Sequence, residues 1–165
     1  MTVGPMRRPS TTVIERREHT GCPASEVFRF FDSPANLERA TPRTIAVSLE
    51  RHPADLRPGS IFGYRLQRWP VDLSWEAVVS EYRPPKGFTN VKSTGYFPKW
   101  TLSHEIISSG AARDEADLRL RLEYEVPSGI YANLTNSYVI REAMEELVDT
   151  QLRCILRALT RKPEV

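Results

Sequence analysis

The sequence contains no run of about 18 consecutive apolar residues, the length that a helix needs to span a bilayer. Its beginning, MTVGPMRRPSTT, also lacks the apolar core of a secretion signal. Only 2 cysteines occur, Cys22 and Cys154. Without export there is little reason for them to pair, and we expect reduced thiols. These features predict a cytoplasmic protein with no membrane span.

Strong charge of one sign is also lacking. The net charge is +2, and the 23 Lys and Arg residues are scattered along the chain. A protein that binds nucleic acid usually gathers its basic residues on one face or in one run. We therefore expect no nucleic-acid partner.

The usual signatures of cofactor and metal sites are absent as well. There is no G-x-G-x-x-G, no G-x-x-x-x-G-K-[ST] and no G-x-S-x-G motif. The 3 histidines, His19, His52 and His104, do not have the spacing of metal ligands, and neither cysteine belongs to a C-x-x-C pair. The sequence predicts neither a cofactor nor a metal site.

The sequence does contain a series of alternating strand patterns, which together fit one domain. The 165 residues show no repeat and no linker, so we expect a flexible tail over 1–10 and a single domain over 11–165. The clearest alternation is DLRLRLEYEV at 117–126, which has leucines on one face and charges on the other. Such alternation is typical of an antiparallel sheet with one solvated face.

The order of the elements predicts the α+β class. A strand at 11–20 precedes two short helices, which open at Pro23 and Pro34. Further strands are expected at 44–52, 60–69, 71–82, 88–95, 100–107 and 117–126, and one long helix at 130–160. The apolar positions of this helix, which include Leu134, Tyr138 and Met144, recur with a period close to 3.6 residues. A helix of this length can cross the whole apolar face of a seven-stranded sheet. A strongly curved sheet does not close flush against one helix, so we expect a cavity between them.

At this point the chain resembles the START-like superfamily, which has the helix-grip fold, and within it the bacterial polyketide cyclase/dehydrase branch. The matching segments are CPASEVFRFFDSPANLERATP, LRPGSIFGYRLQRWPVDLSWEAVVSEYRPPKGF, GYFPKWTLSHEI and LEYEVPSG, at 22–42, 56–88, 95–106 and 122–129. The resemblance implies a curved seven-stranded antiparallel sheet wrapped around a long C-terminal helix. It also implies an apolar ligand, and only some members of the superfamily are enzymes.

The chain departs from the enzymes of that branch at two places. Where aromatase/cyclase members carry W-x-S-x-R, it has Trp75, Ala77 and Val79. Where many relatives carry W-x-H-x-H, it has Trp100, Leu102 and His104. Both changes make the expected cavity more apolar, which favours binding over catalysis.

His104 is the best polar candidate for this cavity. It shares one strand face with Trp100 and Leu102, so it is either a core histidine with satisfied nitrogens or the polar group of a binding site. An imidazole can donate or accept a proton near neutral pH, so it could hold a ligand carbonyl or act as general acid/base.

The remaining candidates are mostly aromatic. Trp75, Trp100 and Tyr124 lie on inward phases of their strands and suit a flat polycyclic ligand. The 60–69 strand has two possible phases. The more apolar one, which we favour, turns Phe62, Tyr64 and Leu66 inward, the other turns Arg65 inward, and Asn90 shares the uncertainty.

The sequence thus predicts a protein, monomer or homodimer, that binds an apolar or polycyclic small molecule. The predicted ligand-binding residues are Tyr64, Arg65, Trp75, Asn90, Trp100, Leu102, His104, Tyr124 and Tyr138. By resemblance the setting is natural-product biosynthesis or self-protection. The alternative is a polyketide cyclase or dehydratase with His104 as general acid/base and a tyrosine or Arg65 stabilising an enolate.

Overall fold

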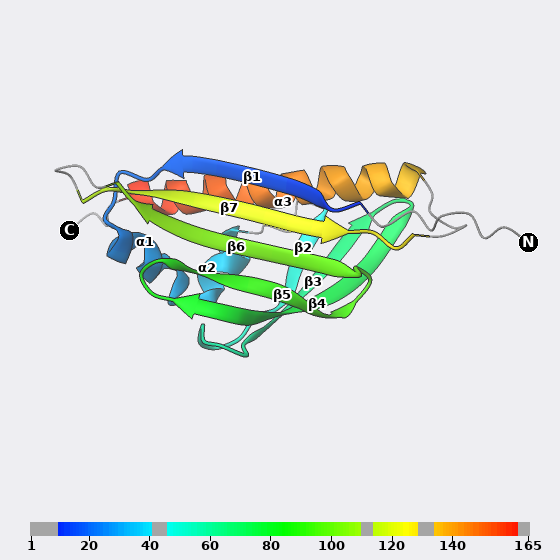
Figure 1. Ribbon diagram of the computed structural model, residues 1–165, viewed down its shortest axis with the longest axis horizontal. Coiled ribbons are helices and arrows are strands. Elements are labelled where there is room, and N and C mark those ends of the chain that lie inside the picture. The colour runs from blue at the N-terminus through cyan, green and yellow to red at the C-terminus, as the bar shows by residue number, and fades with distance from the viewer. Residues whose placement is uncertain (1–9, 41–45, 110–113, 129–133, 162–165) are drawn as a thin grey trace, which may run out of the picture.

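The structure is a computed structural model, which describes residues 10–40, 46–109, 114–128 and 134–161. Most of the tail expected at 1–10 lies outside these ranges. One sheet of seven antiparallel strands, in the order β1-β7-β6-β5-β4-β3-β2, wraps around a single long helix (Figure 1). The strands are β1 Thr12–His19, β2 Val47–Arg51, β3 Ile61–Arg68, β4 Val71–Arg83, β5 Gly87–Gly95, β6 Lys99–Ser108 and β7 Ala116–Glu125. The predicted class and the predicted order of the elements along the chain are confirmed.

Two short helices follow β1, as the two prolines predicted. They are α1, Ala24–Phe31, and α2, Pro34–Ala40. The carbonyl of Pro23 accepts hydrogen bonds from the amides of Glu26 and Val27, which starts α1. In Figure 1 both helices lie at one end of the sheet, and α2 packs against the long helix.

The long helix, α3, runs from Leu134 to Thr160 behind the sheet (Figure 1). One stripe of the helix is buried against the inner face of the sheet, and it consists of Val139, Ile140, Ala143, Met144, Leu147, Val148, Gln151, Leu152 and Ile155. Burying each of the larger apolar side chains contributes roughly 1.5–3 kcal/mol. The stripe is therefore the main contact that holds the sheet and the helix together.

Ion pairs tie α3 to the sheet on both of its sides. Arg16 of β1 contacts Asp149 at 2.9 Å. Arg68, at the end of β3, contacts both carboxylate oxygens of Glu146 at 2.9 Å and lies 3.8 Å from Glu142. Because these groups are partly exposed, each pair contributes at most about 1 kcal/mol. They orient a helix that is already docked by its apolar stripe.

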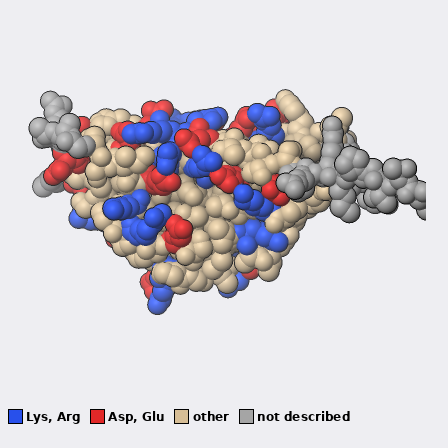
Figure 2. Space-filling view, viewed as in Figure 1, with Lys and Arg blue, Asp and Glu red and all other residues tan. Residues whose placement is uncertain are grey.

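The outer face of the sheet carries charges of both signs. Figure 2 shows basic and acidic side chains interspersed over this face. Ion pairs join neighbouring strands here, such as Arg121 with Glu15 at 3.0 Å and Lys99 with Glu123 at 3.1 Å. This face therefore has no patch of one charge, in line with the scattered charges of the sequence. In the ranges that the structure describes, no helix combines the length and the apolarity needed to cross a bilayer.

Gly95 allows β5 to pass close to β4 beside Trp75. Its φ is +107°, and a Cβ there would lie 2.5 Å from the Cα of Trp75. Gly59 has a similar φ of +86°, but a Cβ there would meet nothing within 4 Å. Substituting each of the two glycines therefore separates the effect of backbone strain from the effect of a steric collision.

We predict that Gly95→Ala destabilises the protein much more than Gly59→Ala. Gly59→Ala is the control, and it loses only the free energy of placing an L-residue at positive φ, about 1–2 kcal/mol. Gly95→Ala adds a collision with the β4 backbone. Urea denaturation of both variants measures the two costs, and equal losses would contradict the close approach of β5 to Trp75.

Candidate functional site

An aromatic cluster occupies the inner face of the sheet where β3, β4 and β6 contribute neighbouring rings. The rings of Tyr64 and Trp75 stack with centroids 5.2 Å apart and planes at 13°. Trp100 lies 5.1 Å from Tyr64 and 5.5 Å from Trp75, with tilted planes. The sheet register explains the first of these contacts, because Tyr64 pairs with Trp75 across β3 and β4. The cluster forms one continuous aromatic wall.

Phe97 and Tyr124 extend this wall. Phe97 contacts Trp75 edge-on at 5.0 Å and Tyr124 at 5.8 Å. Tyr124 lies directly opposite Trp100 in the pairing of β6 and β7. Edge-to-face and offset contacts of this kind are worth about 0.5–1.5 kcal/mol each beyond area burial.

His104 lies on the same strand as Trp100, four residues along and on the same face. Its ring stacks on Phe88 of β5 with centroids 4.3 Å apart and planes at 11°. Phe31 of α1 contacts it edge-on at 5.3 Å. The side chain is 1% exposed, and neither ring nitrogen makes a hydrogen bond of good geometry with the residues that the structure describes.

The aromatic surroundings keep this imidazole neutral. Burial lowers the pKa of His104 from its usual 6.5 to about 4, although the Gln151 side chain on α3 opposes the shift. The ring is therefore uncharged at neutral pH, with one nitrogen that donates and one that accepts.

Asn90 is the second buried polar side chain on the sheet. It is 0% exposed and lies opposite Leu102 on β6. It neighbours the Tyr64 hydroxyl, where it opposes the rise in the tyrosine pKa that burial causes. Neither its carbonyl oxygen nor its amide nitrogen completes a hydrogen bond of good geometry with a described residue, and the same is true of the indole nitrogens of Trp75 and Trp100.

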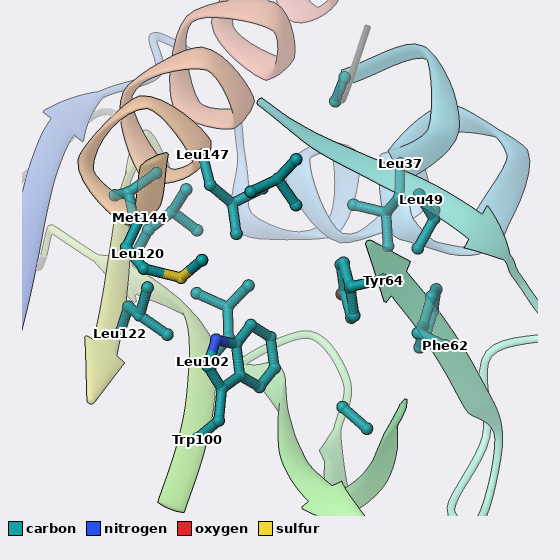
Figure 3. Close-up of a cluster of buried hydrophobic side chains, with 14 of the residues drawn as sticks. Leu37, Leu49, Phe62, Tyr64, Trp100, Leu102, Leu120, Leu122, Met144 and Leu147 are labelled. Carbon is teal, nitrogen blue, oxygen red and sulfur yellow. The ribbon is translucent and has the colours of Figure 1, made fainter. Parts of the chain in front are cut away.

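These side chains are packed in the interior between the sheet and the helices. Figure 3 shows side chains from several elements converging on one interior, with Tyr64 on β3, Trp100 and Leu102 on β6, Leu120 and Leu122 on β7, and Met144 and Leu147 on α3. This interior is apolar and aromatic, and a few polar atoms are set among its side chains. This composition is typical of sites for small molecules.

A separate groove of about 370 Å³ lies on the outer face of the sheet. Gly63 and Gly95 leave its floor without side chains, and the ion pair of Arg51 with Glu76 lies beside it. Tyr64 and Trp75 of the aromatic cluster also line this groove, and its other residues are glycine, polar or charged.

Neither a protein-family model nor a curated protein sequence matches this chain. Solved structures do match it over nearly its whole length. TTHA0849 from Thermus thermophilus is 12% identical with a TM-score of 0.69, covering 93% of this chain and 100% of that one. Norcoclaurine synthase from Thalictrum flavum, in complex with dopamine and hydroxybenzaldehyde, is 12% identical with a TM-score of 0.67, covering 99% of both chains.

A plant protein from ginseng also has a similar structure. Major latex-like protein 151 from Panax ginseng is 12% identical with a TM-score of 0.59, covering 90% of this chain and 97% of that one. The chain has the helix-grip fold. The resemblance found in the sequence is thus confirmed at the level of the fold, while the polyketide cyclase/dehydrase branch remains a prediction.

Within this helix-grip domain, most of the predicted site residues lie together on the inner face. They are Tyr64, Trp75, Asn90, Trp100, Leu102, His104 and Tyr124, and each is buried. The inward phase of β3 is the one with Phe62, Tyr64 and Leu66, which the more apolar choice favoured.

Arg65 was predicted as a candidate for the opposite phase, and the structure corrects it. Its side chain lies on the outer face and forms an ion pair with Asp72 at 3.0 Å. Since Tyr64 and Leu66 both face inward, strand alternation turns Arg65 away from the interior.

Tyr138 also requires correction. It is 64% exposed, and its hydroxyl donates to Glu142 at 2.8 Å. It precedes Ile140 by two residues, which is a rotation of about 200° around the helix. Tyr138 therefore lies on the outer side of α3, and Leu134 is exposed as well.

Several interior residues were missing from the sequence-based set. Phe31, Phe88 and Phe97 were not connected with the site, because their contacts join segments far apart in the chain. Gln151 had a signal that was overlooked: it falls in the buried stripe of α3 between Val148 and Leu152. A polar residue in such a stripe is a candidate for an interior contact.

We predict that His104 makes the stability of the protein fall as the pH falls from 6.5 to 4. In this window the unfolded chain binds a proton that the folded imidazole, with its pKa of about 4, does not. The loss should approach about 3 kcal/mol at the low end and vanish above pH 6.5. His104→Leu should lack this component and match the wild type near pH 7, as measured by urea denaturation across the pH range.

His19→Gln provides a control of opposite sign. Asp117 and Glu115 raise the pKa of His19 through hydrogen bonds, so its protonated form stabilises the fold at low pH and loses this effect as the pH rises. An unchanged pH dependence in His104→Leu would contradict a buried neutral imidazole.

Proposed function

We propose that this protein binds an apolar, polycyclic small molecule between the inner face of the sheet and α3. The observation that carries the proposal is the combination of aromatic walls with buried polar side chains. Asn90 and His104 are at most 1% exposed, yet their polar atoms make no hydrogen bond of good geometry with the described residues. Buried polar groups are nearly always paired in native proteins, so such groups mark a place where a ligand binds.

The similar structures agree with this proposal without fixing the ligand. Norcoclaurine synthase from Thalictrum flavum was solved with two small aromatic molecules, dopamine and hydroxybenzaldehyde. A shared helix-grip fold hosts many functions, so the support for binding comes from the residues of this chain.

A cyclase or dehydratase is the rival function, and the geometry favours it less. A base with a pKa of about 4, as His104 has, provides little driving force for removing a proton at neutral pH. Arg65, the proposed partner for an enolate, is held on the outer face by Asp72. Binding requires neither group to act as a catalyst.

The proposal extends to the setting of the protein. On the basis of the sequence resemblance, we propose a role in natural-product biosynthesis or self-protection. We further propose a cytoplasmic monomer or homodimer. Native mass spectrometry of protein purified from its own host would identify both the bound molecule and the number of chains.

We predict that fused-ring aromatic compounds quench the fluorescence of Trp75 and Trp100. The measurement uses the Trp69→Phe variant, because Trp69 is 91% exposed and would add a signal unrelated to the site. Binding should also raise the melting temperature, since a ligand that binds only the folded state stabilises it. A varied panel that produced neither quenching nor a thermal shift would contradict the proposed function.

A further inference from the structure

The polar atoms of the interior have an unequal balance of donors and acceptors. An indole nitrogen can only donate a hydrogen bond, and those of Trp75 and Trp100 are buried without a partner among the described residues. The amide of Asn90 adds two N–H donors and one carbonyl acceptor. The neutral His104 adds one donor and one acceptor. Donors therefore outnumber acceptors among these four side chains.

The interior also contains no charge to match a charged ligand. The buried polar residues that the structure describes are Thr20, Ser60, Asn90, His104 and Gln151, and none of them is a carboxylate, a lysine or an arginine. The hydroxyls of Thr20 and Ser60 already donate to the backbone carbonyls of Ala116 and Asp55. A buried ionic group without an opposite charge is strongly unfavourable, so a cationic amine or a carboxylate does not suit this site.

We infer that the ligand is an uncharged aromatic molecule with carbonyl oxygens, such as an aromatic ketone or a quinone, whose oxygens accept hydrogen bonds from Trp75, Trp100 and Asn90. The inference rests on the proposed function and deepens it. The flat ring system suits the aromatic wall, where Tyr64 and Trp75 stack with planes at 13°. The oxygens supply the acceptors that the interior donors require.

Three probes of one shape test this inference. Fluorene is the hydrocarbon, 9-fluorenone adds one carbonyl, and 9-fluorenone-4-carboxylate adds a charge. Isothermal titration calorimetry at neutral pH should show 9-fluorenone binding about tenfold more tightly than fluorene, which corresponds to about 1.4 kcal/mol. The carboxylate should bind more weakly than 9-fluorenone.

The outcomes separate the inference from the proposed function. Equal affinities for fluorene and 9-fluorenone, or tightest binding of the carboxylate, would overturn the ligand class and leave binding in the interior intact. Absence of binding by all three probes would count against both the inferred ligand class and the proposed function.

A second measurement uses the unaltered protein. Each of the 3 tryptophans gives one indole N–H signal in a ¹⁵N-correlated NMR spectrum. 9-Fluorenone should move the proton signals of Trp75 and Trp100 downfield relative to fluorene, because a hydrogen bond to oxygen deshields the proton. The exposed Trp69 serves as the internal reference and should not move. Equal shifts with both probes would overturn the assignment of the donors.

Matched variants complete the test. Trp100→Phe removes one interior donor, and Trp69→Phe makes the same change on the surface. The tenfold preference for 9-fluorenone should fall to about fivefold in Trp100→Phe and stay unchanged in Trp69→Phe, since Trp100 is one of three donors and contributes roughly a third of the effect. Asn90→Leu, which keeps the side-chain shape, should reduce the preference similarly. A preference retained in both interior variants would overturn the inference.

Discussion

The burial of one sheet face against α3 is the interaction on which the rest of this structure depends. Seven strands present their apolar side chains in one direction, and only a long element can cover them together. The buried stripe of α3 does this along the helix, from Val139 to Ile155. Ion pairs at Asp149 and Glu146 then tie the helix to β1 and β3. Because burial contributes about 25 cal/mol per Å² of apolar surface, the docking of this helix also creates the interior in which the candidate site lies.

The interior combines two requirements that oppose each other. Aromatic packing excludes water, which lowers the pKa of His104 and raises that of Tyr64. The same exclusion makes each polar atom without a hydrogen bond costly. A core selected for stability alone would have apolar residues at Asn90 and His104, as it has at Leu102, which pairs with Asn90 across the strands. The retention of polar groups in this environment is the observation that supports the proposed binding of a ligand.

The comparison with known structures shows that chains with very low sequence identity can share the helix-grip fold. A TM-score of 0.69 accompanies only 12% identity with TTHA0849. Many combinations of residues can form alternating strands, two short helices and one long helix with an apolar stripe. Apolar burial is not specific to side-chain shape. Function depends instead on a few positions. In this chain, the outward Arg65 and the weakly basic His104 are the two positions that support the proposed binding role over the rival catalytic one.

Local patterns in the sequence determined the elements of this protein, and the tertiary structure decided which of them meet. The alternation over 117–126 predicted β7 and its inward leucines, because the side-chain period of a strand is a local property. The more apolar phase of β3 likewise predicted the inward position of Tyr64. The period of α3 predicted its apolar stripe but not the side on which Tyr138 lies, because residues near a helix end can leave the stripe without breaking the pattern. The environment of His104 could not be read from its own strand, since Phe31, Phe88 and Gln151 reach it from α1, β5 and α3. Contacts between distant segments set the pKa and the polarity of the site, and these contacts exist only once the sheet has closed around the helix.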